Sequence, residues 1–91
     1  MDIRQGIRLH ILQNFLFTDD PSALSDDESF LERGFIDSTG VIEIAHFLED
    51  TFGIDVEGAE MLPENLDSID NLVAYVERKR AARAQASPAG S

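Results

Sequence analysis

One hydroxyl side chain near the middle of the chain, Ser38, stands where chemistry could act on it. It lies in residues 34–40, GFIDSTG, where an acidic segment gives way to the apolar repeat of a predicted helix. Asp37 and Ser38 side by side at such a point usually cap a helix. A hydroxyl at an exposed helix start is also accessible to another enzyme, and a phosphodiester there would meet unpaired N–H groups and the positive end of the helix dipole. On spacing alone, helix capping and covalent modification both remain open.

A third role for Ser38, that of a catalytic nucleophile, is not supported by the rest of the sequence. A serine hydroxyl needs a base at hydrogen-bond distance. His46 lies eight residues further on, about 12 Å along a helix, and cannot reach. The sequence does not exclude His10, yet there is no Gly-x-Ser-x-Gly motif and no strand before the serine. We expect no catalytic residue, and we expect His46 to be an exposed helix residue.

The acidic segment before Ser38 does not have the pattern of a metal site. An EF-hand loop needs alternating oxygen ligands, a glycine at its sixth position and a glutamate at its twelfth. Counted from Asp19, those positions hold Leu24 and Phe30. The chain has no cysteine, so no thiolate site is available either. We expect no specific metal site.

Composition describes a small acidic domain. The chain has 91 residues, a net charge of −11 and no cysteine, and a chain of this length forms one domain. Neither a leader peptide nor a membrane-spanning apolar run is recognised, so we expect a cytoplasmic location. The negative charge would repel nucleic acids and anionic lipid surfaces, and it favours protein partners that carry basic patches.

The apolar repeats predict an all-α fold. We expect a small antiparallel bundle of three longer helices and one short helix. Ile54 and Val56 alternate with acids, but a lone strand has no partner here, so we assign them to a loop. The predicted helices are residues 2–17, 38–52, 64–67 and 68–80.

Signals at the ends of these helices refine the prediction. Asp19, Asp20 and Pro21 are expected to end the first helix, and the connection over 19–37 contains a short apolar turn closed by Gly34. Residues 1–80 would form the domain, and 81–91 a basic, small-residue tail that is partly disordered, although helix propensity extends to about residue 86. Three aromatic side chains are expected in the core: Phe15, Phe47 and Phe52.

From Phe30 to about Val76 the chain resembles the acyl carrier protein family. The Asp37–Ser38 pair stands at the start of an acidic amphipathic helix, as in that family, and the length, the acidity and the order of segments agree with it. The other residues that carry the resemblance are Phe30, Leu31, Glu32, Gly34, Glu43, Leu48, Glu49, Phe52, Ile54, Val56, Ser68, Ile69, Leu72 and Tyr75.

This resemblance implies a 4′-phosphopantetheine arm attached covalently to Ser38, with Asp37 helping to present the serine to the modifying transferase. It also implies that the acidic second helix docks on basic partner surfaces. The partner-binding residues expected there are Thr39, Glu43, Glu49 and Asp50.

Departures from the common family pattern narrow the subtype. Two residues, Phe35 and Ile36, lie between the glycine and the Asp-Ser pair, where fatty-acid-synthase carriers typically have one. Thr39 stands in the place usually held by Leu or Met, and Gly40 where an acid is common. The run is more similar to free-standing carriers that serve D-alanyl, aminoacyl and specialised acyl ligases than to the housekeeping fatty-acid carrier.

The implied function is that of a stand-alone, monomeric carrier that is not itself an enzyme. It would hold an acyl or aminoacyl group as a thioester on the arm and deliver it to other enzymes. Its partners would be a phosphopantetheinyl transferase, an acyl- or aminoacyl-activating ligase, and downstream acyl-transfer enzymes with basic docking patches. The alternative is an acidic helical interaction module without a prosthetic group, in which Ser38 is only a cap.

Overall fold

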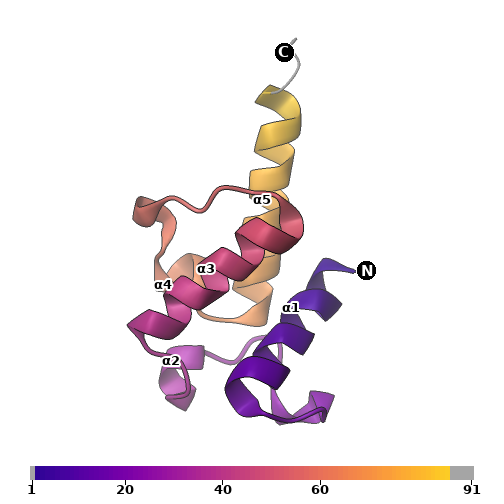
Figure 1. The fold of residues 1–91 in the computed structure, drawn as a ribbon, viewed down its shortest axis with the longest axis vertical. Coiled ribbons are helices and arrows are strands. Elements are labelled where there is room, and N and C mark those ends of the chain that lie inside the picture. The colour runs from indigo at the N-terminus through magenta and orange to yellow at the C-terminus, as the bar shows by residue number, and fades with distance from the viewer. Residues whose placement is uncertain (1, 87–91) are drawn as a thin grey trace.

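The computed structural model describes residues 2–86 and shows a bundle of α-helices (Figure 1). The longer helices are α1 (Ile3–Ile11), α3 (Ser38–Phe52) and α5 (Ile69–Ala86), and the short ones are α2 (Phe30–Arg33) and α4 (Pro63–Leu66). α1 and α5 pack on each other and run in opposite directions, and α3 passes in front of α5 in Figure 1. The predicted all-α class is confirmed. Within residues 2–86 there is no strand, so Ile54 and Val56 lie in a loop as expected.

The helix ends follow local signals in the sequence. α3 has the predicted bounds, and Gly53 ends it in the left-handed region at φ 68°. Ser68 precedes α5, and its Oγ accepts a hydrogen bond from Asn71 N at 3.1 Å, as expected of a cap. α5 continues to Ala86. Residues 87–91 of the predicted tail lie outside the described residues.

The first helix differs from the prediction. After Ile11 it widens into a π-helical turn, Leu12–Leu16. The turn ends at Phe17, which takes a left-handed backbone conformation with φ 54° and donates its N–H to Leu12 O. Asp19, Asp20 and Pro21 therefore do not end this helix, because it has already closed at Phe17.

The connection from Phe17 to Asp37 is anchored at several points. Its apolar turn forms the one-turn helix α2, which Gly34 closes at φ 75°. Ser29 caps α2 and hydrogen-bonds Asp67, whose backbone oxygen also accepts from Phe30 N at 2.8 Å. This anchoring fixes the position of the segment that leads into Ser38.

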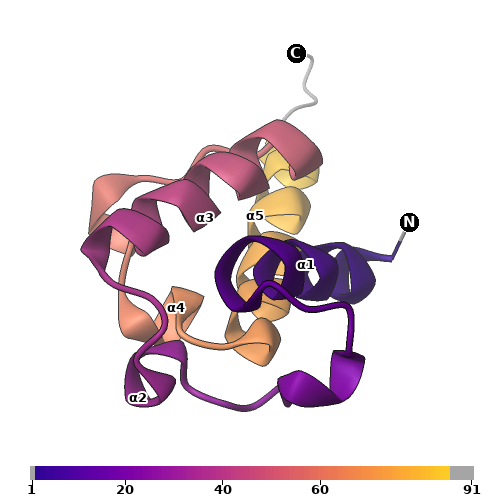
Figure 2. The same ribbon diagram turned by 60° about the horizontal axis from the view of Figure 1, so that its bottom comes forward.

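Figure 2 shows the five α-helices arranged around one centre, and each of them contributes to one hydrophobic core. One buried side chain from each α-helix, in chain order, is Ile7, Phe30, Leu48, Leu66 and Tyr75. The three aromatic residues expected in the core are only partly buried and pack against its edge: Phe15, Phe47 and Phe52.

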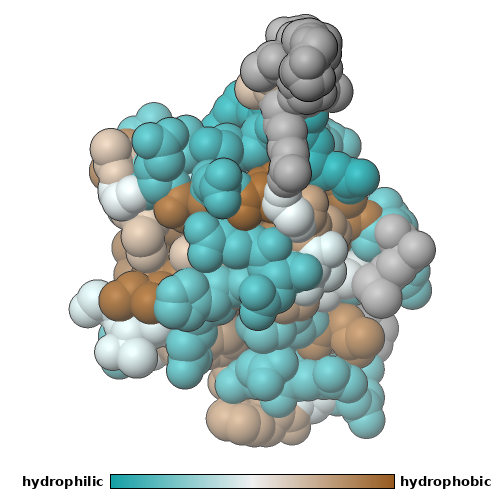
Figure 3. Space-filling model, turned by 45° about the horizontal axis from the view of Figure 1, so that its top comes forward, coloured by the Kyte–Doolittle hydropathy of each residue, from teal (hydrophilic) through white to brown (hydrophobic). Residues whose placement is uncertain are grey.

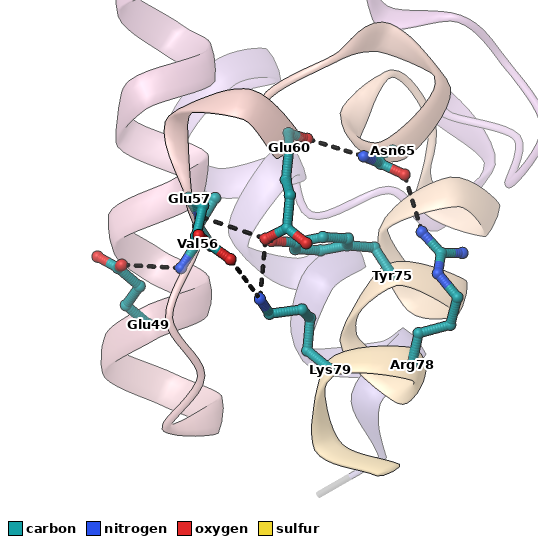
Figure 4. Close-up of polar contacts among 8 residues, drawn as sticks. All are labelled: Glu49, Val56, Glu57, Glu60, Asn65, Tyr75, Arg78 and Lys79. Carbon is teal, nitrogen blue, oxygen red and sulfur yellow. Dashed lines mark hydrogen bonds and ion pairs between the residues drawn. The ribbon is translucent and has the colours of Figure 1, made fainter. Parts of the chain in front are cut away.

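The loop between α3 and α4 is tied to both neighbouring long helices (Figure 4). Glu60 Oε1 accepts hydrogen bonds from Tyr75 Oη at 2.9 Å and from Lys79 Nζ at 2.8 Å, both on α5. Glu49 Oε2 on α3 accepts from Val56 N at 3.0 Å. The bond from Lys79 lowers the pKa of the Glu60 carboxyl, and burial raises the pKa of the Tyr75 hydroxyl, so these groups keep complementary roles as acceptor and donor.

The surface mixes polar and apolar residues. On the face seen in Figure 3, hydrophilic residues cover much of the area and hydrophobic residues appear between them. No helix among residues 2–86 is long and apolar enough to cross a membrane, and no group of three potential metal ligands is found there. The exposed large apolar side chains of the described residues are Leu9, Phe17, Leu31, Ile42 and Leu62.

Candidate functional site

At the start of α3, Asp37 and Ser38 have different surroundings. Asp37 is the N-cap, and its Oδ1 accepts a hydrogen bond from Gly40 N at 2.9 Å. Ser38 is the first residue of the helix, is exposed, and makes no hydrogen bond within residues 2–86 through its hydroxyl. Spacing alone could not decide which of the two residues caps the helix. The structure shows that Asp37 is the cap, and the Ser38 hydroxyl is accessible.

The backbone amides at this helix start favour an anion. The first turn of α3 contains no acidic side chain, and the amides of Ser38 and Thr39 have no acceptor within the described residues. Unpaired N–H groups at a helix N-terminus, together with the helix dipole, stabilise a phosphate group. A phosphodiester on Ser38 would lie next to these groups.

Neither histidine serves Ser38 as a base. The His10 ring stacks on Phe47 with a centroid separation of 3.9 Å, and its Nδ1 lies 3.2 Å from the Asn14 amide nitrogen. Its Nε2 is buried without a hydrogen-bond partner in the described residues. Burial lowers the pKa of His10, and the charge of Glu43 partly opposes that shift. His46 is exposed on α3, as expected.

An apolar pocket of about 340 Å³ adjoins Ser38. Its walls come from α2, from α3 and from the segment at the start of α4. Sequence reasoning missed this pocket, because its exposed apolar residues Leu31, Ile42 and Leu62 were not among the positions that the apolar repeats assign to the core. The sequence did contain one sign of the pocket: these large apolar side chains have no place in the predicted core.

The four expected partner-binding residues do not form one surface. Thr39 and Glu43 are exposed and border a second hollow beside Ser38, together with Asp37. Asp50 is exposed too, but it lies twelve residues beyond Ser38, about 18 Å along the helix. Glu49 is half-buried and is engaged by Val56 N, so its carboxylate supports the loop after α3.

Gly40 allows the π-helical turn Leu12–Leu16 to approach the start of α3 closely. A Cβ at this position would lie 3.0 Å from Phe15 Cε1 and 3.1 Å from Ile36 Cγ2. Those distances are shorter than ordinary carbon contacts of about 3.5–4.0 Å. A glycine in place of the acid common in the family therefore has a structural reason, which is close packing of the π-helical turn below Ser38.

The residues around Ser38 fit a phosphopantetheine arm. The hydroxyl is exposed and makes no hydrogen bond, two backbone amides beside it lack acceptors, and an apolar pocket of about 340 Å³ adjoins it. The first two features suit a phosphodiester, and the pocket suits the less polar part of an arm or its cargo.

Comparison with known proteins identifies the family. Residues 11–76 match the family model described as "Phosphopantetheine attachment site". The chain is 33% identical over 70 residues to an acyl carrier protein of Rhodococcus erythropolis, covering 77% of this chain and 75% of that protein. It is 35% identical over 79 residues to a D-alanyl carrier protein of Lactobacillus acidophilus, covering 85% and 94%. A D-alanyl carrier protein of Streptococcus suis is 34% identical over 76 residues, covering 84% and 92%. The chain therefore belongs to the family of carrier proteins that hold a covalently attached 4′-phosphopantetheine.

Proposed function

We propose that Ser38 is the attachment point and that the chain carries an acyl or aminoacyl group to partner enzymes. One observation supports this most strongly: Asp37 caps α3, while the adjacent Ser38 hydroxyl is exposed and makes no hydrogen bond within residues 2–86. When attached, the arm supplies a thiol on which a carboxylic acid is held as a thioester.

The residues of the helix start act by positioning. Asp37 fixes the first turn through Gly40 N, so the direction of the Ser38 side chain is set by the helix. The amides of Ser38 and Thr39 stabilise the phosphodiester charge once it forms. No base of this chain contacts the Ser38 hydroxyl among the described residues, so the transferase must take up its proton.

The proposal also names three kinds of partner enzyme and assigns no catalytic step to this chain. The phosphopantetheinyl transferase acts on Ser38, an activating ligase loads the arm, and acyl-transfer enzymes with basic surfaces receive the cargo. The net charge of −11 favours such surfaces. A cytoplasmic location and a monomeric state remain part of the proposal. The family match does not favour the alternative of an interaction module without a prosthetic group.

Modification in vitro tests the proposal. The purified protein is incubated with coenzyme A and a broad-specificity phosphopantetheinyl transferase, and intact mass is measured. We expect one phosphopantetheine on the wild-type chain, none on Ser38→Ala, and complete modification of Thr51→Val, which removes another exposed hydroxyl of α3. An unmodified wild-type chain across several transferases, or modification that survives Ser38→Ala, would show that the proposal is wrong.

A further inference from the structure

The ring of His10 has surroundings that suit its neutral form and oppose its charged form. Asn14 Nδ2 donates a hydrogen bond to His10 O at 3.0 Å, and the same nitrogen lies 3.2 Å from His10 Nδ1. An amide NH2 group donates two hydrogens and accepts none, so Nδ1 must accept from it. The one hydrogen of the neutral ring is then on Nε2, which is buried and has no partner among the described residues.

A second proton would leave the His10 ring without any hydrogen-bond acceptor. Nδ1–H would point at the Asn14 NH2 group, so a donor would face a donor, and Nε2–H would still lack a partner in the described part of the chain. A buried charged group without hydrogen bonds is strongly disfavoured. The attraction of an imidazolium to the face of Phe47 offsets only part of this penalty, because it supplies no acceptor.

The charged groups near His10 do not remove this penalty. Among the described residues, Glu43 on α3 is the group whose charge acts on the ring, and it opposes burial without reversing it, so the pKa of His10 stays below its ordinary value. Arg8 on the same helix is paired with Asp26, and the π-helical turn Leu12–Leu16 contains no charged residue. The other residues that line the hollow at His10 are uncharged: Gly6, Leu9, Gln13, Asn14, Phe47 and Thr51.

The buried edge of the ring reaches water only when two elements part. The ring stacks on Phe47 of α3, with a centroid separation of 3.9 Å, and it meets Phe15 of the π-helical turn edge-on, at 6.1 Å. Phe15 in turn packs on the start of α3, where its Cε1 lies 3.0 Å from the position of a Cβ on Gly40. His10, Phe15 and Gly40 therefore form a continuous series of contacts that ends in the first turn of α3, beside Ser38.

We propose that His10 is a pH-sensitive contact between α1 and α3, and that protonation of its ring loosens the π-helical turn Leu12–Leu16 from the start of α3. The charged ring leaves Phe47 in order to reach water. Phe15 then loses the edge contact that holds it against Gly40. The loosening sets in as the pH falls below about 6.5, where a histidine exposed to water gains its proton.

The rest of α1 stays in the core, so the loosening is local. Ile7 and Ile11 of α1 are buried, and α1 also packs on α5. The region that the loosening reaches is the first turn of α3, which contains Ser38. The effect does not require a group attached to Ser38, so it stands apart from the proposed function.

Proton–nitrogen correlation NMR of the unmodified protein between pH 7.5 and 5.0 tests this proposal. We expect the backbone signals of Phe15 and Gly40 to shift together with the His10 ring, with one midpoint below about pH 6.5, while the signal of Leu72 on α5 stays in place. His10→Phe keeps an aromatic ring and should abolish the shift. His46→Gln is the matched control, because it removes the exposed histidine of α3 and should leave the shift unchanged.

Several outcomes would overturn this role of His10. A midpoint at or above about pH 6.5 would show that the folded chain does not oppose the charged ring. A ring that titrates while Phe15 and Gly40 stay in place would show that the proton is taken up without loosening the turn. A Leu72 signal that moves with that of Gly40 would show a change of the whole fold, and a shift that persists in His10→Phe would belong to another group.

The wild-type titration decides between the first three outcomes even if His10→Phe does not fold. None of these outcomes depends on whether Ser38 accepts phosphopantetheine. Failure of the proposed function would appear separately, in the mass of the chain after incubation with the transferase.

Discussion

Replacing Gly40 with alanine tests how tightly the π-helical turn Leu12–Leu16 packs on the helix that carries Ser38. The added Cβ would lie 3.0 Å from Phe15 Cε1 and 3.1 Å from Ile36 Cγ2. Overpacking costs about 1–3 kcal/mol, and the higher helix propensity of alanine offsets about 0.8–1.0 kcal/mol of it at most. We therefore expect Gly40→Ala to lower the free energy of unfolding by about 1 kcal/mol, a fall in Tm of about 4–8 °C.

A double-mutant cycle with Phe15→Leu shows whether the clash is the cause. Urea denaturation is measured for both single variants and for the combined variant. The smaller leucine gives way to the new methyl group, so the combined loss should be about 1 kcal/mol less than the sum of the single losses. Gly58→Ala is the control, because a Cβ there meets nothing within 4 Å. Losses that add to within about 0.5 kcal/mol would refute the reasoning, since Phe15 would then not be the group that the methyl meets.

Two further predictions concern charged groups. Because burial lowers the pKa of His10, the unfolded chain binds more protons, so Tm should fall as pH drops below about 6.5. His10→Phe should weaken that fall, measured by circular dichroism melts from pH 7.5 to 5.5. Glu49→Lys should lower stability by about 1 kcal/mol because Val56 N loses its acceptor. Glu43→Lys should leave Tm nearly unchanged yet slow modification of Ser38 at low salt. Equal Tm values for Glu43→Lys and Glu49→Lys would contradict the assignment of a structural role to Glu49 alone.

The sequence predicted those parts of the fold that local signals specify. α3 was expected over 38–52 and has those bounds, because an acidic cap precedes its apolar repeat and Gly53 follows it. Gly34 and Ser68 were likewise identified from the residue types that helix ends require. The widening of α1 after Ile11 has no such signal. A π-helical turn keeps apolar residues close to helical spacing, so periodicity predicted a continuous helix through Phe17.

The sequence proposes the centre of the candidate site, which stays a prediction, but it gave no indication of the hollows around it. The Asp37–Ser38 pair could be identified from its place in the chain, whereas the division of tasks between the two required the hydrogen bond to Gly40 N. Glu49 appears on the outer face of α3 by periodicity. Its carboxylate is nevertheless used by the loop that folds back after the helix, a contact that depends on tertiary structure. The hollow bordered by Phe17, Asp37 and Thr39 also depends on tertiary structure, because three separate segments line it.

The cap at Asp37 also separates modification from folding. Had Ser38 been the cap, attaching a group to its oxygen would have removed the acceptor for a backbone amide, at a cost of about 1 kcal/mol. Because Asp37 accepts the bond from Gly40 N, a group attached to Ser38 would leave this capping bond in place. On the proposed function, the first turn of α3 would then be formed before the arm is attached, because its cap does not involve the Ser38 oxygen. The stability of the folded carrier would then be the same whatever fraction of it has been modified.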